Sequence, residues 1–103
     1  MSEVLAWINQ TVTQYPVVIF MKGTADNPMC RFSKSAVQVL KDCGAENITS
    51  VNVLESDVVR QGIKDYSNWP TLPQVYINGE FVGGADILSE MQRTGELQSL
   101  LSS

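Results

Sequence analysis

Cys30 is the residue of this chain best placed to do chemistry. It stands in the run Asn27-Pro28-Met29-Cys30-Arg31-Phe32-Ser33, between a short apolar segment and a segment with helical periodicity. A thiol at a helix N-terminus faces unpaired backbone N–H groups and the positive end of the helix dipole, and both favour the thiolate. The thiolate is the form that attacks sulfur and binds metal. The alternative is a buried cysteine that acts only as a small apolar side chain.

Any redox cycle at Cys30 needs a second sulfur that the Cys30 motif itself does not supply. Ser33 occupies the position three residues on where a C-x-x-C motif would carry its second cysteine, and serine cannot close a disulfide. Cys43 follows Cys30 by 13 residues, which along a continuous helix is roughly 20 Å at ~1.5 Å per residue. Because a disulfide needs Cα atoms closer than about 7 Å, we exclude an intramolecular Cys30–Cys43 bridge and expect Cys43 to be buried.

Composition limits the class of protein. The chain has 103 residues, of which 44% are hydrophobic and 17% charged, so we expect one folded domain over residues 1–103. The net charge of -4, without a cluster of Lys or Arg, argues against nucleic acid or an anionic membrane as the partner. The longest strongly apolar run, 17–21, is far shorter than the ~20 residues of a spanning helix.

The cellular compartment is predicted from the N-terminus and the cysteines. The first residues show no basic segment followed by an apolar one, so we find no secretory signal. Two cysteines without tight spacing do not form a disulfide framework, which favours a reducing compartment. We therefore expect a cytoplasmic protein, or one in an organelle matrix if a transit peptide has been removed.

Hydrophobic periodicity predicts an alternation of helices and strands. The apolar run 17–21 is typical of a buried strand, the segment 48–54 alternates as a second strand, and Asn78-Gly79 between apolar runs is a strong hairpin signal. Ser56 is the expected cap of the helix that reaches Tyr66. The predicted helices are 3–15, 31–42, one capped by Ser56 that runs to Tyr66, one that follows the run 83–86 and ends before Gly95, and a short last one after Gly95. This order predicts a mixed sheet, with a parallel βαβ half, an antiparallel hairpin and helices on both faces.

Two further segments have more than one interpretation. Pro73 opens the third strand either as a simple turn or with a cis peptide bond that turns the Leu72 backbone outward beside Cys30. The run Gly83-Gly84-Ala85-Asp86 is either a flexible turn with Asp86 as the helix cap, or a set of N–H groups that binds a carboxylate while Asp86 accepts an ammonium. Lys22 and Arg60 could hold a second carboxylate, or they are ordinary solvated side chains.

Four separated motifs together resemble the monothiol glutaredoxins of the CGFS class. The similarity covers nearly the whole chain and rests on Met21-Lys22-Gly23-Thr24, Pro28-Met29-Cys30-Arg31-Phe32-Ser33, Asn68-Trp69-Pro70-Thr71-Leu72-Pro73-Gln74 and Gly83-Gly84-Ala85-Asp86-Ile87. The resemblance implies an α/β thioredoxin fold, in which a four-stranded mixed sheet has helices on both faces. It also implies a cis Pro73 and a groove for glutathione.

The same resemblance implies how ligands are held. Lys22 and Arg60 would bind the glycine carboxylate of glutathione, and the backbone of Leu72 would pair with its cysteinyl part. Ala85 and Asp86 would hold the γ-glutamyl end. Two such subunits would form a homodimer around one 2Fe-2S cluster, with Cys30 of each and the thiols of two glutathiones as ligands. Iron–sulfur assembly or recipient proteins would be the partners.

Three positions depart from the family pattern. Arg31 replaces the usual glycine, Leu72 the common phenylalanine and Ala85 a frequent cysteine. The Arg31 cation is expected to lower the pKa of Cys30, while its bulk is expected to crowd the cluster or the partner subunit.

Three functions follow as hypotheses. The first is a carrier or scaffold of a bridging 2Fe-2S cluster that passes to target proteins. The alternative is a glutathione-dependent thiol–disulfide oxidoreductase that uses Cys30 alone. Free glutathione would then resolve the product of the Cys30 attack on a protein–glutathione mixed disulfide. The third is a regulatory interaction module that has lost both activities through Arg31.

Overall fold

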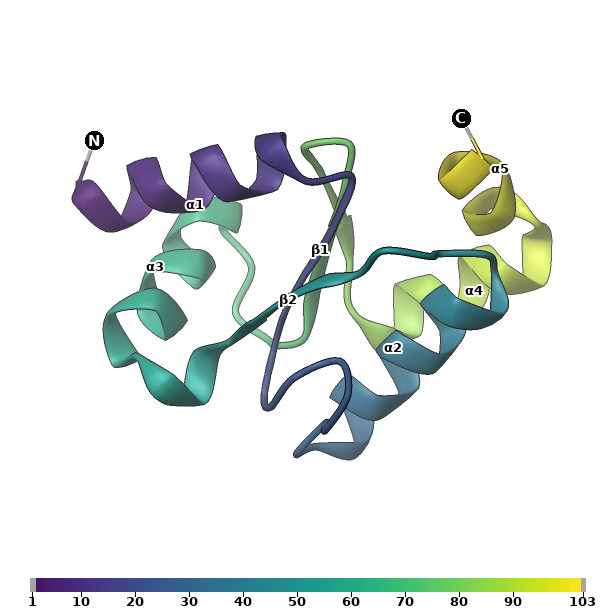
Figure 1. The fold of residues 1–103 in the computed structure, drawn as a ribbon, viewed down its shortest axis with the longest axis horizontal. Coiled ribbons are helices and arrows are strands. Elements are labelled where there is room, and N and C mark those ends of the chain that lie inside the picture. The colour runs from purple at the N-terminus through teal and green to yellow at the C-terminus, as the bar shows by residue number, and fades with distance from the viewer. Residues whose placement is uncertain (1, 103) are drawn as a thin grey trace.

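A computed structural model describes residues 2–102, which build one four-stranded sheet with helices on both sides (Figure 1). The strands are β1 (Val17–Met21), β2 (Thr49–Asn52), β3 (Gln74–Ile77) and β4 (Glu80–Gly83), in the spatial order β2-β1-β3-β4. β2 runs parallel to β1, whereas β3 pairs antiparallel with both β1 and β4. The mixed sheet predicted from the sequence is therefore confirmed.

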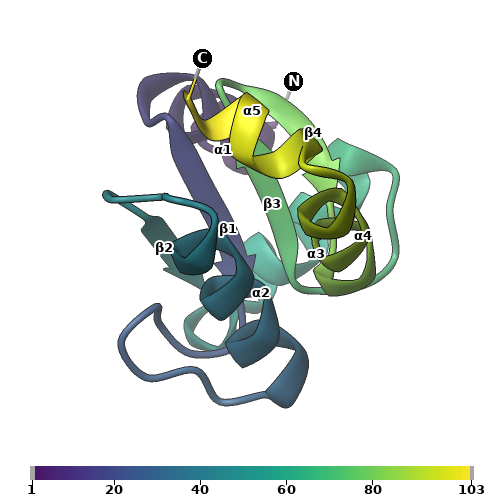
Figure 2. The same cartoon turned by 90° about the vertical axis from the view of Figure 1, so that its right-hand side faces the viewer.

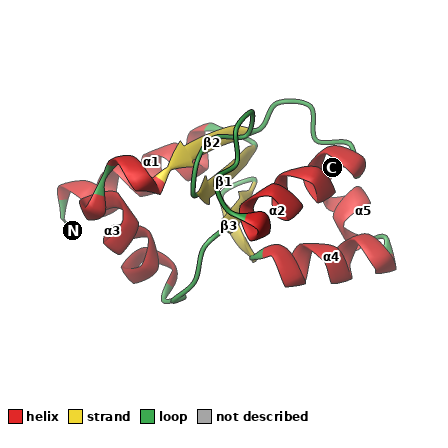
Figure 3. Ribbon diagram, turned by 90° about the horizontal axis from the view of Figure 1, so that it is seen from below, coloured by secondary structure: helices red, strands yellow, loops and turns green. Residues whose placement is uncertain are grey.

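The helices divide between the two faces of the sheet (Figure 3). Two pack on one face, α1 (Glu3–Gln14) and α3 (Asp57–Ser67). The other face carries α2 (Arg31–Asp42), α4 (Ala85–Thr94) and the short α5 (Glu96–Ser102). None of the described helices is both long enough and apolar enough to cross a bilayer.

The central strand β1 serves both layers of the core. Val18 and Phe20 belong to the cluster shared with α1 and α3, while Ile19 and Met21 belong to the cluster on the α2 side. Side chains of a strand alternate between faces, so a strand covered on both faces is apolar at every position. This explains why the run 17–21 carries no polar residue.

The second strand is shorter than the sequence predicts. β2 ends at Asn52 rather than at Leu54, and a 3₁₀ turn, η1 (Val53–Glu55), follows it. The Asn52 side-chain oxygen accepts a hydrogen bond from the Leu54 N–H at 3.0 Å. Because an asparagine oxygen can cap a turn that starts directly after it, this local bond ends the strand.

Two other local predictions are confirmed. The Ser56 hydroxyl accepts a hydrogen bond from the Val59 N–H at 3.2 Å and so caps α3. The hairpin of β3 and β4 turns at Asn78 and Gly79, whose φ angles of 52° and 83° fit a two-residue turn.

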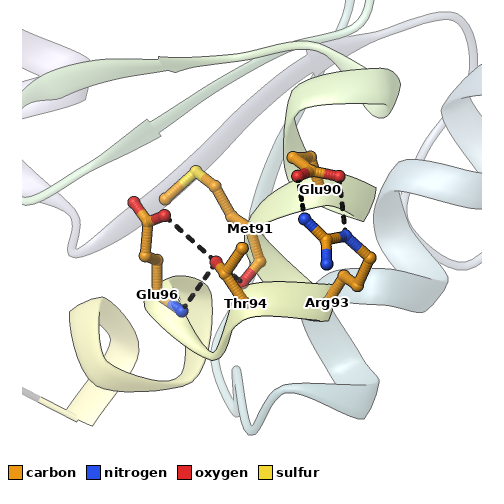
Figure 4. A network of polar contacts seen from close by, with 5 residues as sticks. All are labelled: Glu90, Met91, Arg93, Thr94 and Glu96. Carbon is orange, nitrogen blue, oxygen red and sulfur yellow. Dashed lines mark hydrogen bonds and ion pairs between the residues drawn. The ribbon is translucent and has the colours of Figure 1, made fainter.

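The junction of α4 and α5 (Figure 4) lies at the C-terminal end of α4, away from the helix start at Ala85. The Thr94 hydroxyl donates to the Met91 carbonyl at 3.2 Å and accepts from the Glu96 N–H at 3.4 Å. Within α4, Arg93 forms an ion pair with Glu90 one turn before it. The bond between Thr94 and the Glu96 N–H marks the start of α5. These contacts do not reach the end of the sheet where α2 begins.

Candidate functional site

Cys30 occupies the N-cap position of α2. The loop that leaves β1 leads into the start of this helix (Figure 2). Its thiol is free and partly exposed. No side-chain hydrogen bond caps this helix start, nor that of α4, whose N-cap is Gly84. By contrast, Ser2 and Ser56 cap α1 and α3. The first N–H groups of α4 are thus free to face an anion, whereas those of Phe32 and Ser33 in α2 face the Cys30 sulfur.

The surroundings of Cys30 favour its thiolate. The backbone N–H groups of Ser33 and Phe32 make the largest contribution that lowers the pKa of the Cys30 thiol below its ordinary value. The positive charges of Lys22 and Arg31 lower this pKa further, and partial burial opposes them. A thiolate at a helix N-terminus beside cations is the reactive form of cysteine. The chemical role predicted for Cys30 therefore has a structural basis.

The loop between β1 and α2 is fixed by hydrogen bonds. The Lys22 N–H donates to the Ser33 hydroxyl at 3.2 Å, and the Met29 N–H donates to the Lys22 carbonyl at 2.9 Å. The Gly23 N–H donates to the same Asn52 oxygen that caps η1, at 3.0 Å. The loop is thereby tied to both α2 and β2, which holds the Lys22 backbone near the start of α2.

A cavity of about 390 Å³ opens beside the start of α2. Its volume falls in the range of roughly 300–1,000 Å³ that is common for small-ligand sites. The walls come from the first turn of α2, from the segment before β3 and from the start of α4. They are Phe32, Trp69, Thr71, Leu72, Pro73, Gly84, Ala85, Asp86 and Ile87.

Four of the predicted site residues meet in this cavity, namely Leu72, Pro73, Ala85 and Asp86. The Leu72–Pro73 peptide bond is cis, so the cis interpretation of this turn is confirmed. Within residues 2–102 the backbone N–H and C=O groups of Leu72 have no hydrogen-bond partner, because β3 begins only at Gln74. Leu72 can thus offer strand-like hydrogen bonds to an extended peptide.

The other predicted residues lie outside the cavity walls. Cys30 stands beside the cavity, two residues before the wall residue Phe32. Lys22 acts on the Cys30 sulfur through its charge. Arg60 is a partly buried residue of α3 and neither lines the cavity nor adds to the charge acting on that sulfur. The structure therefore groups the predicted set around Cys30 with the exception of Arg60.

The interpretation of Asp86 as the cap of α4 is wrong. Gly84 is the N-cap, since its carbonyl accepts the Leu88 N–H at 3.0 Å, and Asp86 is an exposed residue of the first turn. A Cβ at position 84 would lie 3.1 Å from the Pro73 carbonyl oxygen. Glycine therefore lets the start of α4 approach the cis proline closely, and it leaves the first N–H groups uncovered.

Several residues that shape the cavity were not predicted as site residues. Phe32 and Trp69 are large aromatic side chains that stay 48% and 41% exposed, and both line the cavity. Gln74 is fully buried in β3, and its Nε2 donates to the carbonyls of Trp69 at 3.1 Å and Thr71 at 3.2 Å. A glutamine at the start of an apolar strand is the sequence signal that could have identified this support.

Cys43 has a structural role, as predicted. It ends α2 as the C-cap residue, is buried in the core, and its thiol is free. Burial raises the pKa of the Cys43 thiol, which disfavours its reactive thiolate. Cys30 and Cys43 stand at opposite ends of the same helix, so the exclusion of a bridge between them is confirmed.

Comparison with known proteins identifies the family. A model of the family described as Glutaredoxin matches residues 17–82. The chain is 50% identical over 96 residues to "Monothiol glutaredoxin-5, mitochondrial" of Schizosaccharomyces pombe, which covers 91% of this chain and 66% of that protein. It is 54% identical over 91 residues to "Monothiol glutaredoxin-S14, chloroplastic" of Arabidopsis thaliana, covering 88% of this chain and 52% of that protein. The chain thus spans less than two thirds of the length of both relatives.

A solved structure agrees with this assignment. The solution structure of reduced poplar apo GrxS14 superimposes with a TM-score of 0.83 at 50% identity, covering 94% of this chain and 88% of that one. The likeness confirms the predicted thioredoxin fold. Taken with the lone thiol at the start of α2, the family match and these relatives show that the chain belongs to the glutaredoxin family, among its monothiol members.

Proposed function

We propose that this glutaredoxin binds glutathione beside Cys30, and that two copies of it hold a 2Fe-2S cluster for delivery to iron–sulfur proteins. The observation that carries the proposal is the meeting of two uncapped helix N-termini at one cavity. One of them presents a thiol with a lowered pKa, and the other presents free N–H groups. We further propose that residues 1–103 act as one domain.

Glutathione fits the chemistry of the site, since it is a tripeptide with a carboxylate at each end and one ammonium. The free N–H groups at Ala85 and Asp86 suit the γ-glutamyl carboxylate, and the Asp86 side chain suits the ammonium next to it. The unpaired backbone of Leu72 suits the cysteinyl part. Lys22 and Arg60, which form no ion pair within residues 2–102, are proposed to hold the glycine carboxylate.

The cluster, as cargo, needs four thiolate-type ligands, and one chain supplies one accessible thiol. Ser33 is buried and Cys43 lies in the core. Within the described residues there is no group of three or more His, Cys, Asp or Glu side chains that could hold a metal. Thiolates are the ligands that iron–sulfur clusters require. Two Cys30 thiolates and two glutathione thiolates complete the set, which is why we propose a homodimer when the cluster is bound.

The second candidate is a glutathione-dependent thiol–disulfide oxidoreductase. The positive charge of Arg31 directly beside Cys30 favours it, because this charge increases the thiolate fraction at neutral pH. Cys30 would attack a protein–glutathione mixed disulfide, and free glutathione would resolve the product.

Anaerobic reconstitution with iron, sulfide and glutathione tests the leading proposal. The expected product is a coloured dimer, measured by visible absorption and size-exclusion chromatography. Cys30→Ser should abolish the colour, whereas the matched control Cys43→Ser should keep it, because only the exposed thiol is proposed as a ligand. A colourless monomer from the unmodified protein would contradict the carrier function. An undiminished yield without glutathione would contradict the proposed ligand set.

The relatives also bear on the compartment. The two proteins compared above carry the words "mitochondrial" and "chloroplastic" in their names. We propose that this chain likewise acts in a reducing compartment, either an organelle matrix or the cytoplasm.

A further inference from the structure

We propose that Arg31 makes the protein selective for substrate thiols flanked by acidic residues, because its guanidinium pairs with a carboxylate next to the reacting disulfide. The inference concerns Arg31, one of the three residues at which the chain departs from its family pattern. It rests on the thiol-exchange activity proposed above, and it adds the class of protein partner that this activity would prefer.

The first step in the argument is the position of the charge. Arg31 is the first residue of α2, directly after Cys30, and its side chain is exposed. Its guanidinium carbon lies 5.0 Å from the centre of the Phe32 ring, a cation–π contact that limits where the charge can move. Phe32 forms part of the cavity wall, so the guanidinium is held against a wall residue of the cavity while its charge still acts on the Cys30 thiol.

The second step is that this charge has no partner of its own. Among residues 2–102 the single ion pair joins Arg93 to Glu90, and the Arg31 side chain makes no hydrogen bond. A guanidinium offers a planar fork of donors that matches a carboxylate in two parallel hydrogen bonds. The free fork beside the thiol therefore suits an acidic side chain brought in by the substrate.

The third step concerns the rest of the molecule. The chain carries a net charge of -4, so an acidic protein is repelled at long range. The attraction to Arg31 is local, so it favours binding of a carboxylate only when that carboxylate lies next to the disulfide. Lys22 is also close enough to act on the sulfur, but it belongs to the proposed glutathione site. Of the two cations that act on the Cys30 sulfur, Arg31 is therefore the one proposed to pair with the protein substrate.

The reaction itself balances with glutathione as the co-reactant. The Cys30 thiolate attacks the glutathione sulfur of the mixed disulfide, which forms a Cys30–glutathione disulfide and breaks the bond to the substrate. The substrate leaves as a thiolate and takes a proton from water. A free glutathione thiolate then attacks the Cys30-bound glutathione sulfur, giving glutathione disulfide and the Cys30 thiolate. The carboxylate pairs with Arg31 in the first of these steps.

Two synthetic peptides test the proposal. Each carries one glutathionylated cysteine, flanked by glutamate in one peptide and by glutamine in the other. The ratio of kcat/KM for the acidic to the neutral peptide is measured with free glutathione. We expect this ratio to be roughly two- to fivefold higher for the unmodified protein than for Arg31→Gln, as for an exposed ion pair. The difference should shrink at high salt.

The design separates pairing from general effects. Arg31→Gln also raises the pKa of Cys30, but this change affects both peptides alike. Glutamate makes the peptide a poorer leaving group, but it does so with both proteins. Both effects therefore cancel when the acidic-to-neutral ratio of the unmodified protein is divided by that of Arg31→Gln. Lys34→Gln removes an equal charge from an exposed position of α2 that does not act on the Cys30 sulfur, so it should keep the selectivity. An equal ratio for the unmodified protein and Arg31→Gln would overturn the inference and leave the exchange activity intact. Failure of both peptides to react would overturn the two together.

Discussion

The backbone N–H of Lys22 donates a hydrogen bond to the hydroxyl of Ser33 over 3.2 Å, which ties the end of β1 to the first turn of α2. Ser33 is only 1% exposed. It occupies the position where a dithiol motif would place its second sulfur. In this protein that position holds the loop carrying Cys30 in place, so Ser33 is a positioning residue.

Replacing Ser33 by alanine should destabilise the protein by roughly 1–2 kcal/mol, because the Lys22 N–H loses its acceptor in a partly buried environment. Ser35→Ala is the matched control, since Ser35 is an exposed residue of the same helix. Both changes alter helix propensity equally. Urea unfolding of the two variants measures the difference, and equal stabilities would refute a positioning role for Ser33.

The reactivity of Cys30 should show its lowered pKa. In a Cys43→Ser background, the rate of alkylation by iodoacetamide should rise with pH to a midpoint below the value of about 8.5 found for an unperturbed cysteine. The backbone N–H groups of Ser33 and Phe32 are the largest cause of the lowered pKa of Cys30. Arg31→Gln should therefore raise this midpoint but leave it below the unperturbed value. A midpoint at or above the unperturbed value would contradict the thiolate assignment.

The loop that leads to Cys30 should not tolerate a side chain at Gly23. Its φ is +92°, and a Cβ there would lie 2.4 Å from the Asn27 carbonyl oxygen and 2.7 Å from the Met29 nitrogen. Gly44 has a similar φ of +104°, but among the described residues a Cβ there would meet nothing within 4 Å beyond its chain neighbours, so Gly44→Ala isolates the backbone strain of about 1–2 kcal/mol. Gly23→Ala should lose clearly more in urea unfolding. Similar losses would show that the loop can relax.

The stability of the protein above about pH 10 should depend on Tyr76. Burial raises the pKa of Tyr76 to about 12, whereas a tyrosine in the unfolded chain ionises near pH 10. Between these values the folded state keeps a proton that the unfolded state has lost, so stability falls as pH rises, by up to about 1.4 kcal/mol per pH unit.

Tyr76→Phe should therefore flatten the loss of stability with pH between pH 10 and 12, measured by urea unfolding. The variant also loses the hydrogen bond from the Tyr76 hydroxyl to Gln74, which shifts stability at every pH without changing the slope. A slope as steep as that of the unmodified protein would assign the effect to other groups.

The features predicted correctly from the sequence depend on short stretches of chain. The buried strand 17–21 needs only a run of apolar residues, the cap of α3 joins Ser56 to Val59, and the hairpin needs Asn78-Gly79. Each is set by interactions within a few residues, so the local pattern contains the information. The end of β2 differs from the prediction for an equally local reason, because the Asn52 side-chain oxygen caps the turn that follows the strand.

The sequence by itself determined the order of helices and strands, the placement of Cys30 at the start of α2 and the burial of Cys43, because periodicity and helix geometry fix these along the chain. Only the tertiary structure decided that Pro73 packs against Gly84 to form a cavity, and that Arg60 lies away from its walls. These relationships join segments distant in sequence. They depend on how the faces of the sheet and helices pack, which no local pattern encodes.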